Sequence, residues 1–174
     1  MGCTEPIAIA LAAALARETL GEPVVRLKVG CSGGMIKNAK SALIPGTGGL
    51  SGMEAAAVAG AIAGKAGEGL RVLSAVSEAM KTEIAAALRD GICTTYQLDS
   101  THELHILVDA WSASHTARVE VRDEHDKVVL LLLDGVRIAG APYADASNAS
   151  EEPEAPRGAQ PGETRKGRYA LSIA

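Results

Sequence analysis

The near absence of aromatic side chains is the feature that most limits how this chain can fold. The 174 residues include no Phe, one Trp and three Tyr, although 47% are hydrophobic and 19 are Gly. The apolar side chains are therefore mostly those of Ala, Val, Leu and Ile. A core of small side chains reaches native packing density only when the backbones approach one another closely. We therefore expect Ala- and Gly-rich elements packed at short separations.

Helices are predicted in the first half of the chain. Thr4 suits the N-cap position of an Ala-rich helix that should run to about Leu20, where Gly21 ends it. Two further Ala-rich segments, at about 51–65 and 70–89, have the high helix propensity of alanine. Their small side chains would allow close helix packing.

Strands are predicted on either side of these helices. The segment at 24–29 alternates loosely between apolar and polar residues. After Gly91, four segments rich in β-branched and apolar residues follow at hairpin spacing, at about 92–98, 103–111, 115–122 and 127–133. The sequence therefore predicts an α+β fold in which Ala-rich helices pack with an antiparallel β-meander.

Composition divides the chain into one domain at 1–140 and a Pro-, Glu- and Gly-rich linker or tail at 141–174. A formal net charge of −4 argues against a nucleic-acid partner, which would call for a basic surface. The apolar run at 7–16 is too short to cross a bilayer and lacks the flanks of a signal peptide. We therefore expect a cytoplasmic protein with reduced thiols and no membrane partner.

Two glycine-rich stretches and one cysteine are candidates for chemistry. The stretches at 30–38 and 44–49 are predicted to be loops that offer backbone N–H groups to an anion, with side-chain donors suited to a carboxylate. Cys3 precedes a helix N-terminus, where the helix dipole would stabilise a thiolate. Such a thiolate can be a nucleophile or a metal ligand; the alternative is a small buried residue at a helix start.

The other cysteines and histidines give weaker signals. Cys31, beside the first glycine stretch, either approaches a site there or is structural, and Cys93 is expected to be buried and inert. His102 and His105 are expected at solvated strand ends, whereas His125 lies in a turn, where functional side chains are often presented. No Ser-His-Asp order stands out along the chain.

Three ordered blocks resemble a known family. They are Gly-Cys-Thr-Glu-Pro-Ile-Ala-Ile-Ala at 2–10, Met-Ile-Lys-Asn followed by Ile-Pro-Gly-Thr-Gly at 35–48, and Glu-His-Asp-Lys-Val-Val at 124–129 followed by Asp-Gly. Together they resemble the L-cysteine desulfidase family, which is related to the alpha chain of iron–sulfur-dependent L-serine dehydratases. The resemblance spans roughly residues 2 to 138.

The resemblance implies a [4Fe–4S] cluster held by three cysteine thiolates, with the fourth iron open to substrate. The reaction would be β-elimination from L-cysteine to pyruvate, ammonia and sulfide, or from L-serine to pyruvate and ammonia. Cys3 matches the first cluster ligand, and His125 matches a hairpin histidine used for positioning or proton transfer. Lys37 is a second candidate catalytic residue. The candidate substrate-binding residues, from the loops and this resemblance, are Glu5, Ser32, Lys37, Asn38, Pro45, Gly46, Thr47 and Gly48.

Members of the family are well over twice as long as this chain, and the remaining cluster cysteines lie in their C-terminal half. The chain is therefore expected to bind a small amino-acid substrate and to need a complementary C-terminal half or a second copy of itself. The alternative is a non-catalytic module that binds a small amino acid or carboxylate through its glycine loops. A third possibility is a truncated product with no function of its own.

Overall fold

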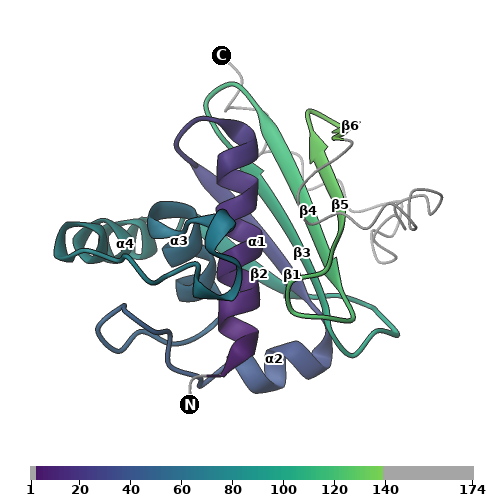
Figure 1. Ribbon diagram of the computed structural model, residues 1–174, viewed down its shortest axis with the longest axis horizontal. Helices are drawn as coiled ribbons and strands as arrows, with labels where there is room; N and C mark the ends of the chain where they lie inside the picture. The colour runs from purple at the N-terminus through teal and green to yellow at the C-terminus, as the bar shows by residue number, and fades with distance from the viewer. Residues whose placement is uncertain (1–2, 139–174) are drawn as a thin grey trace.

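The computed structural model describes residues 3–138 and has the expected α+β class (Figure 1). The tail at 141–174 lies outside the described residues. The elements are α1 (Thr4–Leu20), β1 (Arg26–Cys31), α2 (Gly33–Ala39), α3 (Met53–Ala63), the 3-10 helix η1 (Ala66–Arg71), α4 (Glu78–Asp90), β2 (Cys93–Gln97), β3 (His105–Trp111), β4 (Thr116–Arg122), β5 (Val128–Leu133) and β6 (Val136–Arg137).

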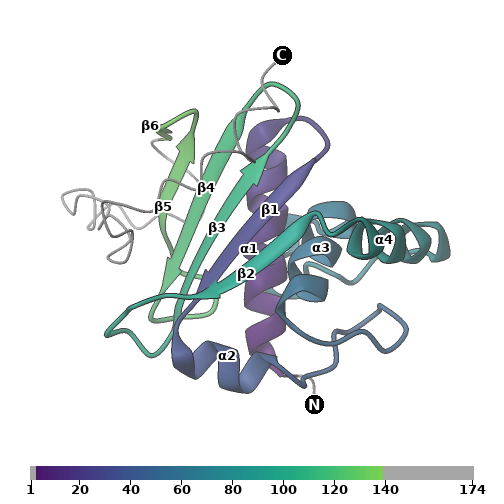
Figure 2. The same ribbon diagram turned by 180° about the vertical axis from the view of Figure 1, so that it is seen from behind.

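The strands form one sheet in the order β2-β1-β3-β4-β5-β6. The predicted antiparallel meander is confirmed for β3 to β5, and β6, which was not predicted, extends it by one short strand. It is wrong for β2, which pairs in parallel with β1 and is separated from β3 by it (Figure 2). The reason is the helical connection between β1 and β2. A long crossover can return the chain in its starting direction, which a hairpin turn cannot do.

Helix α1 is the centre of the core. Of its 17 residues 12 are buried, and they surround the helix on all sides. One side packs on the sheet, whose central strands present Val29, Val108 and Val119 in register. The helix also packs on η1 and on α3, which lies beside it and itself contacts β1 and β2 (Figures 1 and 2). A helix that is apolar all round is stable only when it is covered in this way.

The crossing of α1 and α3 leaves no room for a side chain on α3 at Gly60. A Cβ atom built there would lie 2.6 Å from Ala10 Cα and closer still to the Ala10 carbonyl oxygen. One turn later, a Cβ on Gly64 would lie 2.7 Å from the Cβ of Ala14. The short helix separation expected from the composition is therefore present, and glycine is what allows it.

Two predicted boundaries are wrong. The first glycine stretch is not an open loop: from Gly33 onward it forms α2, and a Cβ on Gly34 would lie 3.0 Å from the backbone oxygen of Glu103. These glycines therefore allow a close backbone approach. The predicted helix at 70–89 is instead the end of η1 followed by α4. The N-cap residue of α4 is Ser77, whose hydroxyl accepts a hydrogen bond from Met80 N at 3.2 Å. Within 3–138 no helix combines the length and apolarity needed to cross a bilayer.

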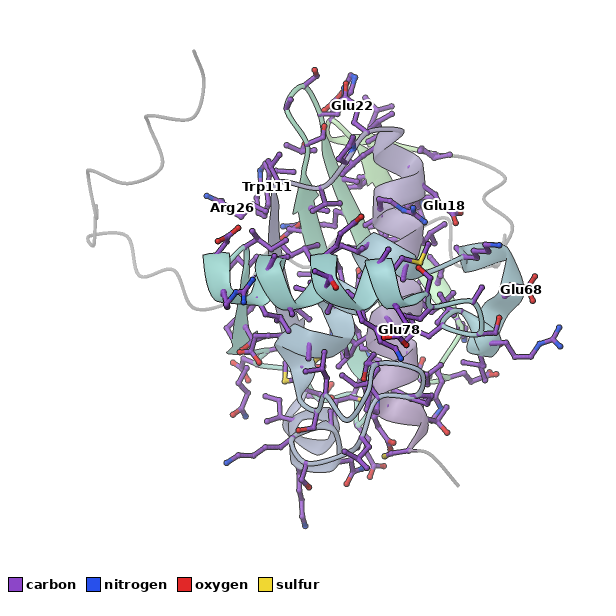
Figure 3. The ribbon with its side chains drawn as sticks, turned by 90° about the vertical axis from the view of Figure 1, so that its left-hand side faces the viewer. Glu18, Glu22, Arg26, Glu68, Glu78 and Trp111 are labelled. Carbon is purple, nitrogen blue, oxygen red and sulfur yellow. The ribbon has the colours of Figure 1, made fainter. Side chains whose placement is uncertain are left out.

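Replacing Gly60 by Ala is expected to lower the free energy of unfolding by about 1–3 kcal/mol, because the added methyl group overpacks the helix crossing. The loss should appear although Ala is favoured over Gly inside a helix by about 1 kcal/mol. Urea unfolding can be followed by the fluorescence of Trp111, the single Trp of the chain, which is half-buried on β3 with the Arg26 guanidinium 4.2 Å from its ring centroid (Figure 3).

Gly67→Ala is the matched control, because nothing lies within 4 Å of a Cβ at that position. Equal midpoints and slopes for the two variants would contradict the close crossing of α1 and α3.

Candidate functional site

Four of the residues singled out in the sequence meet at the N-terminal end of α1. Cys3 and Glu5 belong to the start of this helix, Asn38 to the last turn of α2 beside it, and His125 to the turn between β4 and β5 (Figure 1). The long sequence separations among these elements make the convergence a property of the fold. We call these four residues the Cys3 cluster.

Glu5 connects the members of the Cys3 cluster. The Cys3 thiol donates a hydrogen bond to Glu5 Oε2 and lies 3.9 Å from the backbone oxygen of Asn38. Asn38 Nδ2 donates to Glu5 Oε1 at 3.2 Å. Cys3 itself is the N-cap residue of α1, with extended backbone angles, and Thr4 is the first helical residue rather than the cap. The cap position turns the thiol toward the carboxylate two residues later.

The contacts of Cys3 favour the protonated thiol rather than the predicted thiolate. The hydrogen bond to Glu5 raises the pKa of the Cys3 thiol, and burial raises it further, although the N–H groups of the helix start oppose both effects. The same hydrogen bond lowers the pKa of Glu5, with further lowering by the amide of Asn38 and the charge of His125. The proton therefore stays on sulfur, next to an acceptor that can take it when a ligand binds the thiolate.

The imidazole of His125 lies near Glu5, but its Nε2 atom makes no hydrogen bond among the described residues. Its Nε2 atom lies 4.0 Å from Glu5 Oε1, is buried, and has no hydrogen-bond partner among the described residues. A buried polar atom without a partner costs free energy, so such atoms in native structures call for an explanation. A bound ligand that donates to or accepts from Nε2 would supply one.

A cavity of about 390 Å³ opens beside Cys3. It is lined by Cys3, Thr4, Ile7, Pro45, Leu70, Arg71, Leu73 and Ser74. Arg71 and Ser74 were not foreseen, because their segment was predicted to be the start of a long helix. The local signal was Gly69, whose φ of 57° and ψ of −128° interrupt η1 just before Arg71. The lining therefore includes one arginine, whose side chain is 81% exposed and whose Nη2 lies 3.6 Å from Glu68 Oε2.

Both hydroxyl groups among the predicted substrate-binding residues make hydrogen bonds inside the protein. Ser32 Oγ donates to the Glu103 backbone oxygen at 2.6 Å, and Thr47 Oγ1 donates to the Ile44 backbone oxygen at 2.8 Å. Both side chains are buried and shape the backbone around them. Of the second loop, Pro45 lines the cavity, whereas Gly46 and Gly48 form left-handed turns.

Lys37, the second candidate catalytic residue, lies exposed in the last turn of α2 and does not line the cavity. The structure does not bring this side chain into the Cys3 cluster.

The other two cysteines lie away from this cavity. Burial raises the pKa of Cys31 to about 12, and burial also raises the pKa of Cys93 to about 12. Both thiols are free, with Cys31 fully buried on β1 and Cys93 partly buried on β2. No group of three metal-ligating side chains occurs within residues 3–138. The described part of the chain therefore offers one thiol, that of Cys3, to a metal at the cavity.

Alkylation should distinguish the three thiols. We expect iodoacetamide to modify Cys3 in the folded chain at mildly alkaline pH more slowly than an ordinary exposed thiol, because its raised pKa leaves less thiolate. Cys31 and Cys93 should stay unmodified. Glu5→Gln should speed modification of Cys3 several-fold by removing the carboxylate that holds the proton, as measured by peptide mass spectrometry against pH.

Glu124→Gln, which removes an exposed carboxylate from the neighbouring β4–β5 turn, serves as the control and should leave the rate unchanged. A slower reaction in Glu5→Gln than in the unmodified chain would contradict the role given to Glu5.

Comparison with known proteins places the chain among relatives of greater length. It is 46% identical over 136 residues to a UPF0597 protein of Lachnoclostridium phytofermentans, covering 78% of this chain and 33% of that protein. UPF0597 proteins of Finegoldia magna and Treponema denticola are each 39% identical, over 130 and 150 residues, with 31% and 35% of their lengths covered. The chain thus spans about a third of the length of these relatives. No family model and no solved structure matches it.

Proposed function

We propose that the chain forms part of a β-eliminating lyase that acts on a small L-amino acid, L-cysteine or L-serine, with a [4Fe–4S] cluster. The observation that supports this proposal is the Cys3 cluster beside the cavity. These residues lie on three separate elements and meet at one place. They belong to the sequence blocks that resemble the L-cysteine desulfidase and L-serine dehydratase family.

The residues at this place fit one ligand of such a cluster. Cys3 is at the cavity, and Glu5 is positioned to accept the proton that the thiol must lose before it binds metal. Cys31 and Cys93 do not fit, since each is held in its protonated form away from the cavity. The other thiolates would come from the part of the protein that the relatives have and this chain does not span. When bound, an iron with an open position supplies a Lewis acid for the leaving group.

The chain's own residues would bind and orient the substrate. Arg71 would bind the α-carboxylate in place of Glu68, whose Oε2 lies 3.6 Å from Arg71 Nη2. Ile7, Leu70 and Leu73 form an apolar part of the cavity lining. His125 does not line the cavity; its Nε2, 4.0 Å from Glu5 Oε1, would exchange a proton through Glu5, which contacts the Cys3 thiol.

Complementation can test this proposal. The chain is co-expressed with the remaining two-thirds of the Lachnoclostridium phytofermentans relative and purified without oxygen. The complex should contain iron and sulfide and release pyruvate from L-cysteine or L-serine, whereas the chain alone should lack a stoichiometric cluster. Cys3→Ala should lose iron and turnover, and Cys93→Ala should keep both. Arg71→Gln should keep the iron and raise KM by roughly tenfold or more, as expected when a charged hydrogen bond is lost.

Two outcomes would count against the proposal. A complete cluster in the chain alone, lost on replacing any of its three cysteines, would show that the ligands are local. A complex without iron or turnover, together with tight binding of L-cysteine or L-serine by the metal-free chain in calorimetry, would favour the non-catalytic amino-acid-binding module.

A further inference from the structure

A second constellation lies away from the Cys3 cluster. Ser100 is in the connection between β2 and β3, His105 opens β3, and Glu120 lies on β4. Ser100 Oγ is 2.7 Å from His105 Nδ1, and Glu120 Oε1 is 2.8 Å from His105 Nε2. A hydroxyl, an imidazole and a carboxylate are therefore connected in series. None of the three lines the cavity beside Cys3.

The ionisation state of Glu120 determines the direction of the hydrogen bonds in this series. Burial raises the pKa of Glu120, but the hydrogen bond from His105 and the charges of Arg122, His105 and Arg118 outweigh it, so the net shift is downward. An ionised carboxylate can only accept, so Glu120 takes the hydrogen bond from Nε2–H of His105. In the tautomer that carries its proton on Nε2, Nδ1 presents its lone pair to the Ser100 hydroxyl. This is the arrangement of a nucleophile, a base and a group that orients the base.

Further contacts hold the series of Ser100, His105 and Glu120 in place. The side chains of His105 and Glu120 are 14% and 13% exposed, so their hydrogen bond is largely shielded from water. Arg122 Nε lies 3.4 Å from Glu120 Oε1. The backbone N–H of His102 donates to Ser100 Oγ at 3.1 Å, which fixes the hydroxyl oxygen. His105 is therefore not the solvated residue at a strand end that its position in the sequence indicated.

Ser100 also faces open space. A cavity of about 570 Å³ is lined by Gly33, Gly34, Gln97, Leu98, Asp99, Ser100, Thr101, His102 and Glu103. Most of these side chains are polar, and the base lies behind the hydroxyl rather than in the cavity. From this geometry we infer that Ser100 is a nucleophile, activated by His105 and Glu120, for esters that carry a small hydrophilic acyl group.

The chemistry balances with water as the only co-reactant. Ser100 Oγ bonds to the ester carbonyl carbon while its proton moves to His105 Nδ1. The C–O bond to the alcohol then breaks, and the alcohol leaves with that proton. Water attacks the acyl-serine by the same route and releases the acid. Glu120 stays ionised throughout and stabilises the imidazolium through Nε2–H.

The β3–β4 hairpin offers an internal control. His115 also pairs with a carboxylate, because its Nδ1 lies 2.7 Å from Asp134 Oδ2. Ser114 is adjacent to it in sequence but, among the described contacts, makes no hydrogen bond to that imidazole ring. Ser114, His115 and Asp134 therefore provide a hydroxyl, an imidazole and a carboxylate without the series connection found at Ser100.

An alkyl fluorophosphonate tests the inference, because its P–F bond breaks as a serine oxygen bonds to phosphorus. We expect the full chain to take up one probe, mapped by peptide mass spectrometry to Ser100. Ser100→Ala and His105→Gln should lose this modification, and Glu120→Gln should slow it by roughly tenfold or more. Ser114→Ala and His115→Gln should react like the unmodified chain. In a Cys3→Ala background, p-nitrophenyl acetate should be hydrolysed faster than the octanoate.

Failure to modify Ser100 in the unmodified chain would overturn the inference, as would equal rates for His105→Gln and the unmodified chain. In either case the hydroxyl would only be closing the turn through His102 N–H. Variant folds are compared by Trp111 fluorescence before rates are compared. The outcome is independent of the lyase proposal, since neither iron nor the longer relatives enter the experiment.

Discussion

The contact of α3 with α1 at Gly60 is the constraint on which the rest of the structure depends. A chain without Phe fills its interior by bringing backbones together, and at Gly60 the separation is set by the Ala10 backbone itself. Because α1 packs on the sheet, on α3 and on η1, its position is fixed by the core around it. Its first residues are therefore held in position even though they lie at the end of a helix.

That position explains the geometry around Cys3. The helix start supplies Cys3 and Glu5, α2 supplies Asn38, and the β4–β5 turn supplies His125, each from an element anchored in the same core. The cavity wall comes from the connections that flank α3, namely the 45–49 loop and η1. The site is thus assembled around the ends of well-packed elements, where backbone groups and side chains remain accessible.

Much of this organisation follows from local sequence signals. The limits of α1, the hairpins from β3 to β5 and the choice of Cys3, Asn38 and His125 as candidate site residues rest on capping, alternation and motif resemblance, all of which are local. The sequence did not predict three long-range contacts. These are the pairing of β2 with β1, the place of Arg71 in the cavity lining, and the hydrogen bonds that connect Ser100, His105 and Glu120. Each of these contacts depends on which strands or loops become neighbours in the fold, and the spacing of residues along the chain does not predict that.

The insertion of β1 between β2 and β3 has a geometric consequence for the connection at 98–104. A hairpin would join adjacent strands, but this segment has to span two strand spacings, or about 10 Å, across the end of β1. Backbone bonds from Leu98 to Cys31 and from Ser32 to His105 tie both ends of the span to that strand. Both ends of the connection that carries Ser100 are therefore anchored on the strand that it crosses, so the position of Ser100 beside the His105 ring depends on the pairing of β1 with both of its neighbours.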